Sequence, residues 1–174
     1  AARHPGFAAL VRGSSRDVAS ATADLARRLG IHDEVLAAVA AMDPPAAPGA
    51  LRGRPAEATD RESSRLLVAE LVGRGPSPTL TTDEAERAGN ELVAGLRTAV
   101  EDYDLAWFAV AVRGLVRLPH LPARLVRDAV TFLVTQQDRS GAVGAPLVDD
   151  PGERVALHRE WTLLAVAALV EAAR

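Results

Sequence analysis

Apolar residues recur along most of this chain at helical spacing, and the helical stretches are separated by segments rich in glycine and proline. No stretch alternates apolar and polar residues for long enough to indicate a strand. The pattern therefore predicts an all-α protein with about seven helices. The expected helices cover residues 15–29, 31–43, 59–73, 81–102, 103–118, 121–137 and 158–174.

Several of these helices carry start and stop signals in the sequence. Thr59 or Asp60 is the expected N-cap of the third helix, and a threonine followed by two acids opens the fourth. Pro44 and Pro45 stop the second helix, because proline has no backbone N–H to donate. The apolar positions of the fourth helix form a single stripe, which consists of Leu92, Val93, Leu96 and Val100.

Residues 44–58 contain proline, glycine and alanine without any periodicity. This stretch is too long for an ordinary connection, so it is either a mobile excursion or a seam between domains. It separates an expected N-terminal helical hairpin, residues 1–43, from an expected core, residues 59–174. Because 174 residues suit a single domain, we expect one domain overall.

The last third of the chain alternates two kinds of helix. Residues 103–118 and 158–174 are apolar on nearly every side, and such helices must be surrounded by protein. Between them, residues 121–137 are amphipathic, with Arg124 and Arg127 expected to face outward. We therefore expect residues 105–116 and 161–171 to be the most buried.

Composition narrows the possible chemistry. Hydrophobic residues make up 48% and aromatic residues only 3%, so alanine, leucine and valine must fill the core. All 20 basic residues are arginine, which is an actinobacterial-type composition rather than a phosphate-binding device. The net charge of −3 offers no electrostatic basis for binding nucleic acid. The absence of cysteine excludes disulfides, thiolate nucleophiles and cysteine metal sites.

No metal site or cofactor is expected. His4, His32 and His120 are scattered along the chain without the spacing of metal ligands. No apolar run reaches the roughly 18 residues of a membrane span, and residues 1–13 do not resemble a signal peptide. The expected location is the cytoplasm.

The loop after the amphipathic helix carries the pattern Gln-x-x-x-Gly-x-Val, formed by Gln137, Gly141 and Val143. Glutamine can bond loose backbone groups at helix ends, and glycine permits a tight reversal. With the order of helices over residues 103–174, this loop resembles the α/α-toroid repeats of terpenoid cyclases and prenyltransferase β subunits, in which the pattern ends in tryptophan. The resemblance implies a partial or divergent toroid-like array of helical hairpins, since the chain has too few helices for a full ring.

The catalytic motifs of these families are incomplete in this chain. The Asp-x-Asp-Asp acid of class II terpenoid cyclases is matched only in part by Asp102 and Asp104, and Asp149 and Asp150 lack a leading acid. The zinc ligands of prenyltransferases and of lanthionine cyclases include cysteine, which is absent. Neither reaction is therefore implied.

The resemblance does point to particular positions, since the N-termini of inner helices face the pocket of a toroid. The matching residues are Asp102, Tyr103, Asp104 and Trp107 on one helix and His158, Glu160 and Trp161 on the next. Aromatic residues with a polar group suit a ligand or partner surface, and the acids and the histidine are candidate acid–base groups. The plainer interpretation is ordinary acids at a helix start, core tryptophans and a hydrogen-bonded histidine.

Three functions are compatible with these observations. The first is an accessory or substrate- or partner-binding protein in the biosynthesis of terpenoids or modified peptides. The second is a small cyclase-type enzyme that uses Asp104, His158 or Glu160 in a pocket walled by Trp107 and Trp161. The third is a helical adaptor or regulator.

Association with another protein or a second copy is also expected. Two helices that are apolar on nearly all sides need more cover than the remaining helices supply, so apolar surface should remain near the two tryptophans. The ligand expected beside such a surface is a peptide or a small apolar substrate.

Overall fold

The computed structural model describes residues 32–42, 49–53, 57–119, 123–138 and 141–173, together with Asp24, Arg27 and Arg28. These residues contain six helices and no strand, which confirms the all-α prediction for this part of the chain. The helices are α3 (His32–Met42), α4 (Asp60–Gly73), α5 (Thr82–Glu101), α6 (Leu105–Leu115), α7 (Ala123–Thr135) and α8 (Pro151–Ala172). The helix expected at 15–29 lies largely outside the described residues, as do Pro44 and Pro45, so the count of seven stays a prediction.

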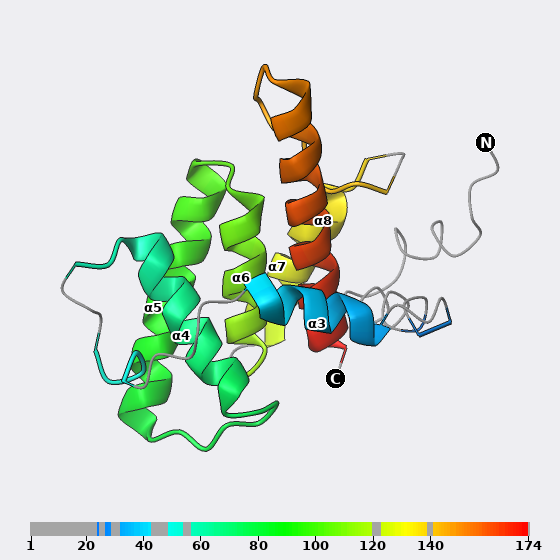
Figure 1. Ribbon diagram of the computed structural model, residues 1–174. Helices are drawn as coiled ribbons and strands as arrows, with labels where there is room; N and C mark the ends of the chain where they lie inside the picture. Colours follow the sequence, from blue (N-terminus) through cyan, green and yellow to red (C-terminus); the bar gives the residue numbers. More distant parts are fainter. Residues whose placement is uncertain are drawn as a thin grey trace.

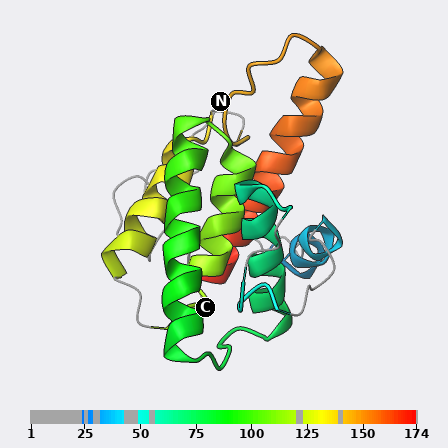
Figure 2. The ribbon, with the colours of Figure 1, turned by 90° about the vertical axis from the view of Figure 1, so that its left-hand side faces the viewer.

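Helix α6 lies at the centre of the fold. It packs against α4, α5, α7 and α8, while α3 packs on α8. The two views in Figures 1 and 2 show α6 between α5 and α8, with α4 beside it. All residues of α6 are buried, so the burial expected from its all-round apolar character is confirmed.

The prediction for α7 is also confirmed. The side chains of Arg124 and Arg127 are 83% and 54% exposed, while Ala129, Val130 and Leu133 face the core.

Helix α8 begins at Pro151, so the predicted start at His158 is wrong. Asp150 is the N-cap, and its side chain accepts a hydrogen bond from the backbone N–H of Glu153. Proline at the first position suits a helix start, because its missing N–H would have no partner there. The apolar pattern misses these turns because residues 151–156 are exposed, and α8 projects beyond its neighbours at this end (Figure 1).

Two helices begin with the same reciprocal cap. Thr59 accepts from the backbone N–H of Glu62, whose carboxylate accepts from the Thr59 backbone, and Thr81 and Glu84 repeat this arrangement. The two N-caps expected from the sequence are thereby confirmed. The hydrogen bonds donated by Thr59 and by Thr81 hold the pKa values of Glu62 and Glu84 below their ordinary range.

The stripe predicted on α5 is correct at Leu92 and Leu96, which are buried, and wrong at Val93 and Val100, which are 39% and 45% exposed. The remaining buried positions of α5 hold small residues, namely Ala88, Gly89, Gly95 and Ala99. Small residues permit neighbouring helices to approach closely. The buried face of α5 is therefore the face that carries these small residues, and the two valines lie outside it.

Part of the expected linker belongs to the core. Residues 49–53 form a turn in which Leu51 is fully buried, and the Leu51 N–H donates to Glu70 Oε2 at 2.9 Å. Burial alone would raise the pKa of Glu70, but hydrogen bonds from Leu51 and from the Arg74 side chain outweigh it and leave that pKa lowered. Residues 49–53 contain no helix, as expected, while residues 44–48 and 54–56 lie outside the described residues.

A buried group of charges joins α6 to the end of α8. Arg113 Nε lies 3.4 Å from Glu171 Oε1, and Arg117 Nη2 lies 3.1 Å from Glu171 Oε2. Arg117 also donates to the carbonyl of Gly75 at 3.0 Å. All three charged side chains are less than a tenth exposed. Two buried guanidinium groups therefore lie beside the same buried carboxylate.

None of the helices in the described residues has both the length and the apolar character that crossing a membrane requires.

Candidate functional site

The loop between α5 and α6 fixes the position of Trp107. Asp102 is the C-cap of α5, and Tyr103 has a positive φ of 53°. Asp104 is the N-cap of α6, and its Oδ1 accepts from the backbone N–H of Trp107 at 2.9 Å. Of the two acids expected at a helix start, only Asp104 is there, and it anchors the backbone of the first turn of α6.

The second oxygen of Asp104 is also engaged. Arg61 on α4 places its Nε 3.2 Å from Asp104 Oδ2. The carboxylate therefore ties α4 to the start of α6, and both of its oxygens have partners. A structural role of this kind explains Asp104 without assigning it a proton-transfer step.

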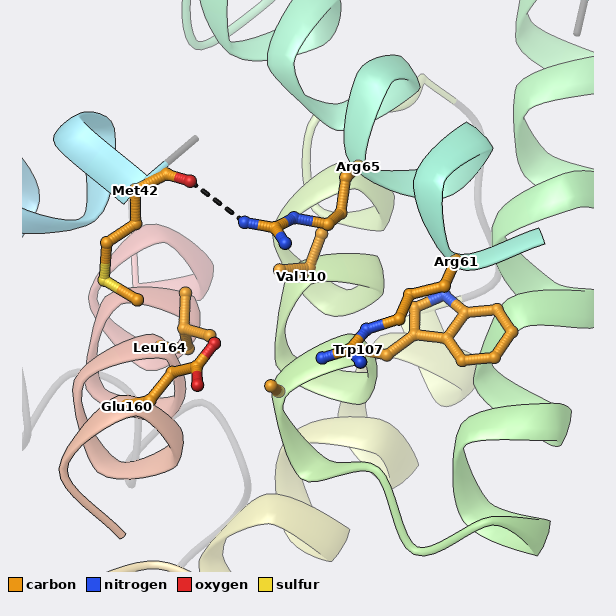
Figure 3. Close-up of a pocket in the computed structure, with 8 residues that line it drawn as sticks. Met42, Arg61, Arg65, Trp107, Val110, Glu160 and Leu164 are labelled. Carbon is orange, nitrogen blue, oxygen red and sulfur yellow. Dashed lines mark hydrogen bonds between the residues drawn. The ribbon is translucent and has the colours of Figure 1, made fainter. Parts of the chain in front are cut away.

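Trp107 is 5% exposed and separates two hollows. We call the first the arginine hollow; it lies between α3, α4, α6 and α8, and its volume of about 10 Å³ is roughly the space for one water molecule. Its lining consists of Met42, Arg61, Arg65, Ala106, Trp107, Val110, Glu160 and Leu164. Figure 3 shows Arg65 bonded to the carbonyl of Met42, with Glu160 projecting from α8 toward the same space.

The second hollow lies between α4 and α5, on the other side of the indole. It has a volume of about 160 Å³, so a ligand held there must be small. Two carboxylates and two hydroxyls line it, together with small side chains and one tryptophan. These residues are Asp60, Ser64, Glu91, Ala94, Gly95, Thr98 and Trp107, and we call this space the acidic hollow.

The indole nitrogen of Trp107 is the unusual atom of the acidic hollow. Trp107 Nε1 is buried and has no hydrogen-bond partner among the described residues. An unsatisfied buried donor costs roughly 1–3 kcal/mol, and few native polar groups remain in that state. The atom is therefore a donor available to an acceptor that enters the hollow.

Gly95 leaves room beside that donor. A Cβ at this position would lie 3.1 Å from Trp107 Nε1 and 3.1 Å from Ser64 Oγ. The glycine thus keeps open a space that is bordered by the indole N–H of Trp107 and the hydroxyl of Ser64. Across the same helix pair, the Ser63 hydroxyl donates to Glu91 Oε1 and fixes one oxygen of that carboxylate.

Tyr103 and Trp161 meet away from both hollows. Their rings are 6.0 Å apart in an edge-to-face arrangement, and the Tyr103 hydroxyl donates to Gln136 Oε1 at 3.2 Å. His158 Nε2 lies 2.8 Å from the carbonyl oxygen of Gly144. The histidine thus corresponds to the plainer interpretation, a hydrogen-bonded residue that supports the loop.

The loop with the glutamine–glycine pattern closes on itself. Gln137 Nε2 donates to the carbonyl of Gly141 at 2.9 Å, and Gly141 has a positive φ of 94°. Val143 is buried, and its N–H donates to Thr162 Oγ1 on α8 at 2.9 Å. The glutamine bonds a backbone carbonyl in the loop, and the valine anchors the loop on α8.

The candidate acid–base residues have different surroundings. Glu160 lines the arginine hollow, whereas Asp104 caps α6 and His158 contacts a loop carbonyl. Trp107 lines both hollows, whereas Trp161 lines neither of them.

The two tryptophans themselves do not form an exposed apolar surface. Both indoles are buried inside the chain, at 5% and 8% exposure. Among the described residues, the exposed large apolar side chains are Val93, Val100, Tyr103, Leu147 and Val155, of which Tyr103 contacts Trp161.

Sequence reasoning did not single out most of the acidic hollow. Asp60 appeared only as a candidate cap, and Ser64, Glu91 and Gly95 were not selected. The sequence signal is two consecutive serines within a predicted helix, and the structure shows that both are almost fully buried. No group of three or more histidine and acidic side chains within the described ranges is placed to hold a metal ion.

Comparisons with protein-family models, with curated proteins and with solved structures found no match to this chain. The functional argument therefore rests on the geometry of the site.

Proposed function

We propose that this protein is a helical binding protein, and that its site is the acidic hollow beside Trp107. The observation that carries the proposal is the buried indole N–H of Trp107, which has no partner among the described residues. Packing alone does not require this arrangement, because a phenylalanine would fill apolar space without leaving a donor unsatisfied. The donor, the hydroxyl groups and the carboxylates together suit the recognition of a polar group on a small ligand or a peptide.

The role that fits such a site is that of an accessory or substrate-binding component. Asp104 and His158 are engaged in holding the backbone, which leaves the cyclase-type alternative without an assembled acid–base pair. The resemblance of the Gln137 loop to α/α-toroid repeats is the ground for proposing this role in the biosynthesis of terpenoids or modified peptides. In that proposal, α6, α7 and α8 form part of a divergent array of helical hairpins, and the Gln137 loop joins the last two.

The test is a ligand screen that compares the protein with a variant whose hollow is filled. We expect members of a library of small polar fragments to bind the purified protein and to move the indole N–H signal of Trp107 in NMR spectra. Gly95→Ala should abolish this binding, because the new methyl group would occupy the space between the indole N–H and Ser64 Oγ.

Gly53→Ala is the matched control. A Cβ at Gly53 meets no atom within 4 Å, so this variant should bind every fragment as the natural chain does. Circular dichroism and melting temperature confirm that both variants are folded. Fragments that bind Gly95→Ala unchanged, or a screen in which the Trp107 signal never moves, would refute the proposed site.

A further inference from the structure

We infer that the acidic hollow recognises a cation, namely a small amine or guanidine that also carries an oxygen acceptor. This inference rests on the proposed binding function and specifies its ligand class. It combines the charge of the lining with the unsatisfied indole donor.

The charge of the lining is one-sided. Asp60 and Glu91 bring two carboxylates to the hollow, and its other polar side chains are the neutral groups of Ser64, Thr98 and Trp107. No arginine belongs to the lining. Carboxylates near apolar walls form their strongest hydrogen bonds with ionised donors, which favours an ammonium or guanidinium group.

The basic residue that follows Asp60 in the sequence lines the other hollow. Arg61 follows Asp60 in α4, but it lines the arginine hollow and pairs with Asp104 at 3.2 Å. The indole of Trp107 therefore stands between a hollow with two guanidinium groups and a hollow with two carboxylates. Neither of these two guanidinium groups lines the acidic hollow, where Glu91 is the carboxylate on which recognition rests.

Glu91 is the carboxylate best placed to recognise the cation. Its Oε1 accepts from the Ser63 hydroxyl, which orients the group between α4 and α5. A carboxylate has more acceptor sites than this one hydroxyl can occupy, so it can bind an ionised donor at the same time. The orientation supplied by Ser63 reduces the entropy that binding would otherwise cost.

The indole donor adds a second requirement. An N–H group cannot accept from an ammonium group, so the Trp107 donor needs an oxygen on the ligand. The ligand class that meets both requirements has a cationic nitrogen and an ether, hydroxyl or carbonyl oxygen on a short apolar frame. Ala94 and Gly95 supply the apolar surface for such a frame.

The experiment titrates ¹⁵N-labelled protein with three probes that share one apolar frame and differ in charge. They are 2-phenoxyethylamine as the cation, 2-phenoxyethanol as the neutral analogue and phenoxyacetate as the anion. The indole signals of the two tryptophans are assigned with Trp161→Phe. We expect the amine to shift the Trp107 indole signal with a Kd about tenfold below that of the alcohol, and the anion to leave it unmoved.

Glu91→Gln tests the proposed contact. The amide keeps an oxygen for the Ser63 hydroxyl but removes the charge, so the affinity for the amine should fall about tenfold while that for the alcohol stays the same. Glu86→Gln is the control, because Glu86 is an exposed acid of α5 that does not line the hollow. The dispersion of the NMR spectrum shows that each variant is folded.

The outcomes separate the inference from the proposed function. Equal affinity for amine and alcohol, unaffected by Glu91→Gln, would overturn recognition of a cation and leave a binding site at Trp107. Preferential binding of phenoxyacetate would overturn it as well. A Trp107 signal that none of these probes moves would refute the inference, and the fragment screen then decides whether the binding site itself is refuted.

Discussion

Replacing Glu171 with glutamine should destabilise the fold severely, because it neutralises the carboxylate that pairs with two buried arginines between α6 and α8. Arg113 and Arg117 lie 3.4 and 3.1 Å from the oxygens of Glu171, and the three side chains are almost wholly inaccessible to water. The amide would leave two buried guanidinium groups without the charge of their shared partner. Removing one partner from a buried ion pair costs roughly 3–5 kcal/mol.

The lower end of that range applies here, since Arg117 retains its hydrogen bond to the carbonyl of Gly75. We therefore expect the free energy of unfolding to fall by about 3 kcal/mol. For a protein of this length, the melting temperature should fall by roughly 6–12 °C. Urea denaturation followed by far-UV circular dichroism measures the free energy, and calorimetry measures the melting temperature.

Asp128→Asn is the matched control for this experiment. It neutralises a carboxylate that pairs with Arg124 on the surface of α7, where the two side chains are 60% and 83% exposed. Such a pair contributes little, so the loss should stay below about 0.5 kcal/mol. A loss below about 1 kcal/mol for Glu171→Gln would show that the buried group is hydrated or rearranges, and the reasoning would be wrong.

Three further substitutions test separate parts of the fold. Gly144→Ala should lower the free energy of unfolding by roughly 2–5 kcal/mol. Gly144 has a φ of 82°, and a Cβ there would lie 2.5 Å from Leu105 Cδ1. A urea denaturation curve like that of the natural chain would contradict the loop geometry. Thr59→Ala should cost about 1 kcal/mol in the same assay through loss of the α4 cap, and no loss would mean that the cap is dispensable. Glu70→Gln should reduce stability at neutral pH by an amount that shrinks in acid. The folded-state pKa of Glu70 is lowered, so its contribution is present above the ordinary pKa of 4.5 and lost as the pH falls through the folded value. Denaturation at pH 7 and pH 3 checks this, and a difference independent of pH would contradict it.

The helices that the sequence predicted correctly have strong local signals. Thr59 and Thr81 stand at the starts of α4 and α5 with a glutamate three residues later, and a cap of this kind forms within one turn. The start of α8 had an equally local signal at Asp150 and Pro151, but the apolar pattern used to place the helix begins only where α8 enters the core.

The candidate site was less predictable. The position of Trp107 near the start of an apolar helix made it a candidate site residue. The sequence did not predict the two hollows beside it. Their walls come from α3, α4, α5, α6 and α8, and no spacing along the chain relates Gly95 to the indole nitrogen of Trp107.

The sequence by itself determined the helical class, the caps of α4 and α5 and the central burial of α6. Each of these depends on neighbours within a few residues or on the apolar character of a whole helix. Only the tertiary structure decided that Val93 and Val100 face outward while Gly95 faces Trp107, and that Glu91 meets Ser63 across two helices. The physical reason is that a helix presents several possible faces, and the close approach of its neighbours selects the one that becomes buried.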